Sequence, residues 1–253
     1  MTRLFKSLSV LLSIAFATAG GAPRDGVAVL VYHRFESAVN DSMTVRTETF
    51  RSQLAYLKQR HAPVIPLRSL ISHLQGRSPA PPPGAVVITV DDGHRSVFTD
   101  MLPLVREYGV QVTLFIYPSA ISNAKYAMTW EQLDTLRKTG LFDIQSHTYW
   151  HPNFKTEKRR LSADAYQTFT TMQLVKSKTV LETKLGVKPD LLAWPFGIYD
   201  DELLRMAHEA GYVAGFTLDR RLVTEREPMM ALPRFLMTES SSSLKSILPQ
   251  EVR

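Results

Sequence analysis

The sequence predicts an α/β fold, a distorted (β/α)7-type barrel that forms a single domain after a signal peptide. Two observations lead to this prediction. Apolar strand segments alternate with helical segments along the chain, and strands that are buried on both faces and joined by helices form parallel sheets. Some seven strand segments follow one another, and closure into a barrel or near-barrel is the simplest arrangement for a sheet of this kind.

The expected strands are continuous apolar runs that end in polar or aromatic residues. The proline-rich stretch "RSPAPPPGA" at 77–85 precedes the second strand, and we interpret it as a stiff connection within one domain. The strand segments cover residues 26–33, 85–92, 111–118, 142–146, 190–195, 212–218 and 231–237.

The expected helices show apolar residues at helical spacing, such as Phe50, Leu54 and Leu57 in the first of them. Later segments end in glycine at Gly109, Gly140 and Gly211, and a left-handed C-terminal cap prefers glycine. The helical segments cover residues 47–60, 67–75, 98–109, 129–140, 162–186 and 200–211.

Residues 1–19 have the pattern of a secretory signal peptide. Arg3 and Lys6 precede a short apolar run, and Ala17-Thr18-Ala19 forms a small-residue cleavage site. The run is shorter than the roughly 20 residues of a transmembrane helix, and no later segment is apolar enough to span a membrane. We therefore expect an exported protein, periplasmic or secreted, with an uncleaved amphipathic anchor as the alternative.

The composition restricts the chemistry that is open to the protein. The chain has no cysteine, which excludes disulfides and thiolate nucleophiles or ligands, so a metal would have to be held by His, Asp or Glu. The formal net charge is +6, but two of the positive charges lie in the signal peptide, and no clustered basic face points to nucleic acid. The oligomeric state is left open.

Polar and aromatic residues gather where four of the strand segments end. These positions are 32–35, 91–93, 146–151 and 194–197. In a parallel barrel the C-terminal ends of the strands meet on one rim, and the chemistry of such barrels is found there. We therefore expect these four segments to form one site.

The acidic pair in "TVDDG" can divide two roles within that site. Side chains of adjacent strand residues point to opposite sides, so Asp91 and Asp92 are not a matched acid–base pair. Where the strand ends, one can bind a metal while the other approaches its water. The alternative is a simple turn in which Asp91 caps the following segment.

The histidine pair in "SHTYWHPN" can complete a metal site. His147 and His151 can converge on one ion if the backbone turns helically, although an isolated pair is more often two surface histidines beside a turn. With Asp92 they make three protein ligands and leave one position open, which is the composition of a catalytic zinc site. Asp91 would then accept a proton, and His33 would return one to the leaving nitrogen.

With these residues the sequence resembles the polysaccharide deacetylases, the NodB-homology domain of carbohydrate esterase family 4. "TVDDG" resembles the family's Thr-Phe-Asp-Asp-Gly motif, "HTYWH" its His-(Ser/Thr)-x-x-His motif and "WPFG" its Arg-x-Pro-Tyr-Gly motif. The resemblance covers roughly residues 27–235 and implies a deacetylase domain over 20–253, with Asp91 as the base and Asp92, His147 and His151 as metal ligands.

The third motif implies a substrate groove. Its residues would wall the groove, with the Phe196 N–H offered to the oxyanion, and we expect Trp194 to stack on sugar rings. The residues assigned to substrate binding are Trp194, Pro195, Phe196, Gly197, Tyr199 and Arg234.

Two departures from the family pattern bear on the chemistry. Ala193 stands where the third motif has its arginine, so the usual partner of the base is missing, and Arg234 in "LPRF" is a candidate substitute. The late Leu-x-His acid of the family has no counterpart either. "VLVYHRF" is similar to the early motif of the branch that deacetylates poly-β-1,6-N-acetylglucosamine, in which the histidine, here His33, is the acid. We expect His94 to have a packing role.

The resemblance implies a metal-dependent hydrolase that removes N-acetyl groups from N-acetylhexosamine units of an exported polysaccharide. The expected ion is Zn²⁺, with Ni²⁺, Co²⁺ or Fe²⁺ as alternatives, and the expected partner is the polysaccharide substrate. Two other functions stay open: an O-deacetylase that acts on a substrate such as acetylated xylan, and a glycan-binding protein that has lost turnover.

Overall fold

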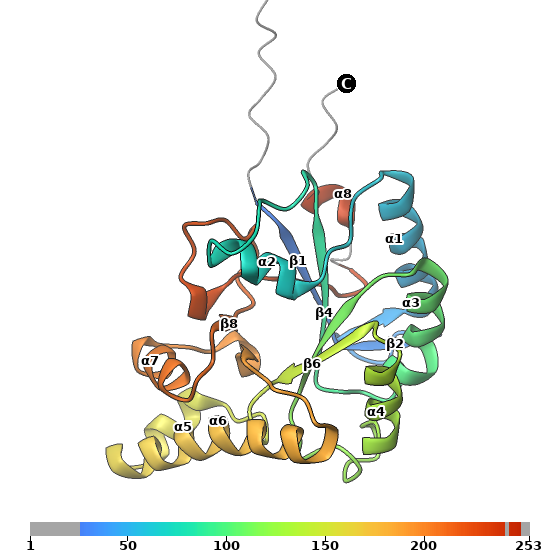
Figure 1. The fold of residues 1–253 in the computed structure, drawn as a ribbon. Helices are drawn as coiled ribbons and strands as arrows, with labels where there is room; N and C mark the ends of the chain where they lie inside the picture. Colours follow the sequence, from blue (N-terminus) through green and yellow to red (C-terminus); the bar gives the residue numbers. More distant parts are fainter. Residues whose placement is uncertain (1–25, 241–242, 249–253) are drawn as a thin grey trace, which may run out of the picture.

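The centre of the fold is one curled sheet of seven strands, all parallel, in the order β8-β7-β6-β5-β4-β1-β9 (Figure 1). The computed structural model describes residues 26–240 and 243–248, and the predicted signal peptide lies outside them. The strands are β1 (Ala28–Tyr32), β4 (Val86–Asp91), β5 (Val112–Ile116), β6 (Phe142–Ser146), β7 (Leu191–Ala193), β8 (Ala214–Phe216) and β9 (Phe235–Leu236), with β2 (Arg34–Glu36) and β3 (Thr44–Arg46) as a separate parallel pair.

Helices cover the sheet and connect its strands (Figure 1). In the described residues, no helix combines the length and apolar character that a membrane span needs. The helices are α1 (Thr47–Gln59), α2 (Leu67–Leu74), α3 (Leu102–Tyr108), α4 (Trp130–Lys138), α5 (Phe154–Arg160), α6 (Ala163–Leu185), α7 (Asp201–Glu209) and α8 (Leu244–Ile247), with a π-helical turn at Val97–Met101 and short 3₁₀ turns at Pro195–Gly197 and Met229–Ala231.

The predicted α/β fold and its parallel sheet are confirmed, and each of the seven strand segments contains a strand of the sheet. Strands β1 and β4 are buried along their whole length, which explains their continuous apolar sequences. The elements that the sequence did not predict are short or polar: β2 and β3 have three residues each, and α5 reads "FKTEKRR". Such segments carry too few apolar residues to display a period.

One segment links the two edges of the curled sheet. The Leu232 N–H donates to the Gly215 carbonyl at 2.8 Å, and its own carbonyl accepts from the Thr217 N–H at 2.8 Å, so that Leu232 pairs with β8. A few residues later, β9 pairs with β1. The barrel is therefore completed by a bent chain segment, and Arg234 lies between its two pairings.

Gly215 is a point of close contact where β8 meets this segment. A Cβ atom at this position would lie 2.4 Å from the Met230 carbonyl oxygen and 2.8 Å from the indole nitrogen of Trp194. Both separations are far below van der Waals contact. Only glycine at this position therefore leaves room for both the Trp194 indole and the Met230 carbonyl.

We predict that Gly215→Ala lowers the free energy of unfolding by about 1–3 kcal/mol, the usual cost of overpacking a core. Denaturant unfolding of the purified variant measures this loss. Gly84→Ala is the control, because a Cβ there meets nothing within 4 Å and only the positive φ of 73° is strained. If the two variants unfold at the same denaturant concentration, the crowding at Gly215 does not matter.

Candidate metal and catalytic site

The candidate site lies at the C-terminal ends of four strands of the sheet, β1, β4, β6 and β7. His33 follows β1, Asp91 ends β4, His147 follows β6 and the segment 194–197 follows β7. The expected convergence of these positions on one rim is therefore present. Asp92 and His151 belong to the loops that leave β4 and β6.

Asp92, His147 and His151 bring three ligand atoms to one point. The Asp92 Oδ1 atom lies 3.6 Å from the Nε2 atoms of both histidines, and the three ligand atoms all lie within 4.8 Å of one another. Tetrahedral zinc with bonds of about 2.0–2.1 Å would separate its ligands by about 3.4 Å. Among the described residues, Asp92 Oδ1 is buried without a hydrogen-bond partner. This donor set fits a divalent ion.

His147 has the tautomer that a metal ligand requires. Its Nδ1 lies 2.8 Å from the Ala193 carbonyl oxygen, and because a carbonyl only accepts, Nδ1 carries the proton and Nε2 presents its lone pair. Burial lowers the pKa of His147 to about 3 and also lowers the pKa of His151. Both rings are therefore neutral at pH 7.

The two histidines converge without a helical turn. Residues 147–151 form a loop, and Thr148 and His151 have left-handed φ values of 62° and 63°. The loop is held by hydrogen bonds from the Trp150 N–H to Gln173 Oε1 on α6, at 3.0 Å, and from the Ser119 N–H to the Tyr149 carbonyl, at 3.1 Å. The i, i+4 spacing suggested a helical backbone over residues 147–151, and this is wrong. The two imidazole rings nevertheless meet.

A left-handed residue also lets the two adjacent aspartates face one site. Asp92 has a φ of 74°, and the Gly93 N–H donates to the Asp91 carbonyl at 3.0 Å. This turn breaks the alternation of the strand, so the Asp92 carboxyl does not point away from that of Asp91. His147 Nε2 lies 3.8 Å from Asp91 Oδ2 and 3.6 Å from Asp92 Oδ1.

Arg234 is the partner of Asp91. Its Nη1 and Nη2 groups donate to the two carboxylate oxygens at 2.8 and 2.7 Å, and both side chains are buried. Burial by itself raises the pKa of a carboxyl, but Arg234 and the nearby His147 outweigh it and lower the pKa of Asp91 to about 2. Asp91 is therefore fully ionised at neutral pH.

The position of Arg234 corrects one assignment. We assigned Arg234 to substrate binding, but its side chain is fully buried and also donates to the Thr217 carbonyl at 3.1 Å and to Thr89 Oγ1 at 3.2 Å. It contacts the carboxylate from inside the barrel and does not reach a groove. Ala193, where the family motif has its arginine, contributes its carbonyl to His147 instead.

His33 follows β1 beside the end of β4, because Tyr32 pairs with Val90 in the sheet. Its Nδ1 atom is buried without a hydrogen-bond partner in the described part of the chain. The imidazole is close enough to Asp91 and Asp92 to act on the pKa of both carboxyl groups. The strand-end position predicted for His33 thus brings it to the same site.

The groove assignment is wrong for Trp194. Its side chain is fully buried, packs against Phe154 at a ring distance of 6.3 Å, and donates its indole N–H to the Met230 carbonyl at 2.9 Å. It cannot stack on a sugar. Gly215 provides the space for this arrangement, and nothing in the local sequence "AWPF" indicates it.

The rest of the third motif divides between the core and the rim. Pro195 is buried, whereas the Phe196 side chain is 57% exposed and its ring lies 4.5 Å from that of His151. Phe196 and Gly197 both have left-handed φ values, and the Tyr199 hydroxyl donates to Asp219 at 3.2 Å. Phe196 is therefore the exposed aromatic of the motif.

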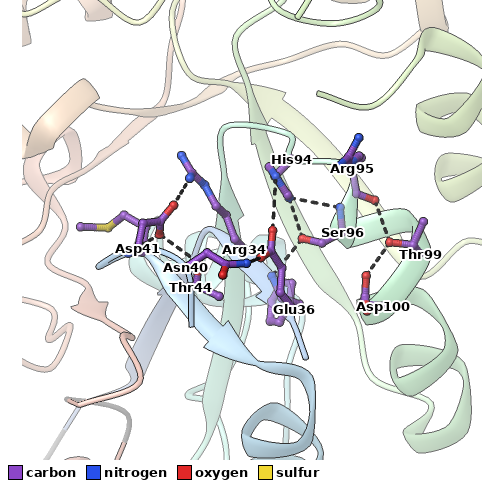
Figure 2. Close-up of polar contacts among 12 residues, drawn as sticks. Arg34, Glu36, Asn40, Asp41, Thr44, His94, Arg95, Ser96, Thr99 and Asp100 are labelled. Carbon is purple, nitrogen blue, oxygen red and sulfur yellow. Dashed lines mark hydrogen bonds and ion pairs between the residues drawn. The ribbon is translucent and has the colours of Figure 1, made fainter. Parts of the chain in front are cut away.

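His94 belongs to a structural network beside the site (Figure 2). Its Nδ1 lies 2.8 Å from Ser96 Oγ and accepts from the Ser96 N–H at 3.3 Å, and Ser96 Oγ accepts from the Phe35 N–H at 2.9 Å. With Nδ1 as an acceptor, the proton is on Nε2, which faces Glu36 Oε1 at 3.9 Å. This agrees with the packing role expected for His94.

Tyr117 is a site residue that the sequence reasoning missed. It directly follows β5, and its ring lies 5.3 Å from that of His151 and 6.4 Å from that of His147. The signal was available, because "QVTLFIYP" also ends in a polar aromatic at the rim.

Comparison with known proteins places these residues in a family context. A family model described as polysaccharide deacetylase matches residues 78–215. The chain is 25% identical over 203 residues to the poly-β-1,6-N-acetyl-D-glucosamine N-deacetylase of Staphylococcus epidermidis RP62A. This alignment covers 78% of this chain and 69% of that protein. It is 25% identical over 264 residues to the protein of the same name from Escherichia coli K12. This alignment covers 90% of this chain and 39% of that protein.

Solved structures resemble the fold. The Streptococcus pyogenes deacetylase PplD aligns with a TM-score of 0.75 at 20% identity, over 85% of this chain and 93% of that chain. IcaB from Ammonifex degensii aligns with a TM-score of 0.73 at 24% identity, over 86% of this chain and 94% of that chain. These likenesses agree with a curled parallel sheet.

We predict that Arg234→Met lowers the free energy of unfolding at pH 7 by about 3–5 kcal/mol, because it leaves a buried carboxylate without its partner. In the wild type the folded pKa of Asp91, about 2, lies below its ordinary value of 3.8, so the pair stabilises the fold above pH 3.8 and loses this effect as the pH falls towards 2. In the variant, burial raises that pKa instead.

The stability difference between variant and wild type should therefore shrink as the pH falls from 7 to 4, as followed by denaturant unfolding. Arg221→Met is the control, because Arg221 is half-exposed in its pairs with Asp219 and Glu227 and should cost less than about 1 kcal/mol. A difference that does not depend on pH would contradict the role of Arg234 as the counter-charge of Asp91.

Proposed function

This chain belongs to the polysaccharide deacetylase family, whose model matches more than half of its length, and from this premise we propose that it removes N-acetyl groups from an exported polysaccharide of the poly-β-1,6-N-acetylglucosamine kind. One observation carries the proposal: three metal-ligand atoms converge beside a buried, ionised carboxylate. The names of the relatives support the substrate class, since those from S. epidermidis and E. coli are called poly-β-1,6-N-acetyl-D-glucosamine N-deacetylases.

Asp92, His147 and His151 would hold the divalent ion, with Zn²⁺ as the first candidate and Ni²⁺, Co²⁺ or Fe²⁺ as alternatives. When bound, such an ion supplies a Lewis acid for the acetyl carbonyl and makes a water molecule more acidic. The unpaired Asp92 Oδ1 and the two neutral imidazoles support this assignment, because a buried anionic oxygen without a partner is costly unless a cation is near it.

Asp91 is the proposed general base. Arg234 holds both of its oxygens in a fixed plane, and each oxygen keeps a second lone pair that can accept a proton. The lowered pKa makes Asp91 a weak base, so its proposed role would depend on a water molecule whose pKa the bound ion would lower. The base and the metal site therefore depend on each other.

His33 is the proposed general acid. An amine leaves as a neutral molecule only if its nitrogen is protonated while the tetrahedral intermediate collapses. His33 follows β1 and His147 follows β6, with β4 and β5 between these two strands, and His33 acts on the pKa of both carboxyl groups. The Phe196 N–H, at a left-handed residue on the rim, is the proposed donor to the oxyanion.

The organisation of the whole chain is part of the proposal. Residues 1–19 would be the signal peptide and residues 20–253 a single deacetylase domain, and the protein would then act in the periplasm or outside the cell. Acetate release from N-acetylglucosamine oligomers, compared with acetylated xylan, tests the reaction. Release from xylan alone would identify an O-deacetylase, and tight glycan binding without release would identify a binding protein.

We predict opposite phenotypes for the two adjacent aspartates. Asp92→Asn should lose bound metal, as should His151→Ala, whereas Asp91→Asn should retain it and lose about 10²–10⁴-fold in kcat, the usual contribution of a general base. Elemental analysis after gel filtration and kcat on N-acetylglucosamine oligomers measure the two effects. Stoichiometric metal in both Asp92→Asn and His151→Ala would refute the ligand set.

We predict that His33→Ala retains its metal and its fold but is severely impaired on amide substrates. An activated ester should be much less affected, because its leaving group departs without protonation. The alkaline limb of the rate–pH profile should also disappear. Equal losses on 4-nitrophenyl acetate and on the oligomers, with an unchanged alkaline limb, would assign the acid to another residue.

A further inference from the structure

Two tyrosine hydroxyls meet at the rim of the site. Tyr117 follows β5, Tyr126 lies in the loop before α4, and their hydroxyl groups form a hydrogen bond with each other. The mechanism proposed above uses neither of them. We refer to them as the tyrosine pair.

The tyrosine pair is held on the side of the metal ligands. The Tyr117 ring lies 5.3 Å from the ring of His151, at an interplanar angle of 41°. The same Tyr117 ring lies 6.4 Å from the ring of His147, the second histidine of the candidate metal site. Tyr117 therefore reaches from the metal ligands to the rim.

The tyrosine pair is also held on the side of Tyr126. The Tyr126 ring stacks on His94, with centroids 6.2 Å apart and planes within 7°, and His94 is fixed by Ser96 (Figure 2). The Tyr126 carbonyl accepts from the Arg95 N–H at 2.8 Å. This backbone contact attaches the Tyr126 loop directly after the Asp91-Asp92-Gly93 turn.

The hydrogen bond between the two hydroxyls leaves capacity for a ligand. Each phenol has one donor and two acceptor sites, and the bond between them uses only one donor. One O–H and further lone pairs remain, and Tyr126 is 39% exposed. A rigid donor and acceptor in one place suit a ligand hydroxyl, which both donates and accepts.

We propose that the tyrosine pair binds the free ring hydroxyl next to the acetamido group of the sugar at the site, and so selects hexosamine units over other acetylated compounds. The inference rests on the proposed function. In a β-1,6-linked N-acetylhexosamine polymer the acetamido group is on C2, and C1 carries the glycosidic bond. The C3 hydroxyl is therefore the free hydroxyl on a neighbouring ring carbon.

The test combines variants of the protein with a variant of the substrate. We would measure kcat and KM for the zinc-loaded wild type, Tyr126→Phe and Tyr117→Phe on a β-1,6-linked N-acetylglucosamine tetramer and on the same tetramer without its C3 hydroxyls. Tyr56→Phe, on α1, is the matched control. Calorimetric titration with both tetramers repeats the comparison without turnover, and metal content and melting temperature are measured for every variant.

On the parent tetramer we expect Tyr126→Phe to raise KM and the dissociation constant about 3- to 10-fold, the effect of one hydrogen bond, with kcat, metal content and melting temperature unchanged. For the wild type, KM and the dissociation constant should rise by the same factor when the deoxy tetramer replaces the parent tetramer. For Tyr126→Phe, the two tetramers should give the same values. Tyr117→Phe should raise KM and the dissociation constant for the parent tetramer in the same way.

Losses that are equal on both tetramers would overturn the inference, since they would show that the tyrosine pair does not contact that hydroxyl. Loss of metal or of kcat with unchanged KM would overturn it as well and give the pair a role in positioning His151. Failure of the wild type to release acetate would refute the proposed function instead, and the titrations would still decide whether the hydroxyl is bound.

Discussion

The ion pair between Asp91 and Arg234 links the architecture of this protein to its chemistry. Both groups are buried, and two parallel hydrogen bonds of 2.8 and 2.7 Å offset the cost of removing their charges from water. Asp91 ends the interior strand β4, while Arg234 comes from the segment that joins β8 to β1. The same contact therefore fastens the closing segment of the sheet and fixes the charge of the candidate base.

Much of the fold could be predicted because burial leaves a direct trace in a sequence. Strands such as β4, with every residue buried, are necessarily apolar runs, and the helices between them show their own period. The last strand segment, 231–237, was also predicted, but the bent course by which it closes the sheet was not. β9 has two residues, and the segment before it pairs with β8 through Leu232 alone, so its course depends on contacts with residues far away in the chain.

The site was predictable where one rule applied, namely that polar residues at the ends of parallel strands meet. That rule brought together Asp92, His147 and His151. The rule does not say whether a side chain at the rim points into the core or towards solvent. The prediction that Trp194 lines a groove was wrong for that reason, because its indole turns inward into the space that Gly215 leaves. Tyr126 could not be found, because it lies in a loop whose position depends on contacts with distant residues, among them residues 93–95 and Tyr117.

The pairing of β1 with β9 has a consequence for the order of events during synthesis. The first strand of the sheet hydrogen-bonds to a strand made some two hundred residues later, at Phe235 and Leu236. Contacts between residues so far apart in the chain slow folding, because the chain loses much conformational entropy before the favourable contact forms. A ribosome-bound chain that ends before Arg234 would carry every candidate metal ligand and yet hold Asp91 without its counter-charge. The candidate site can therefore form its buried ion pair only after Arg234 has been made.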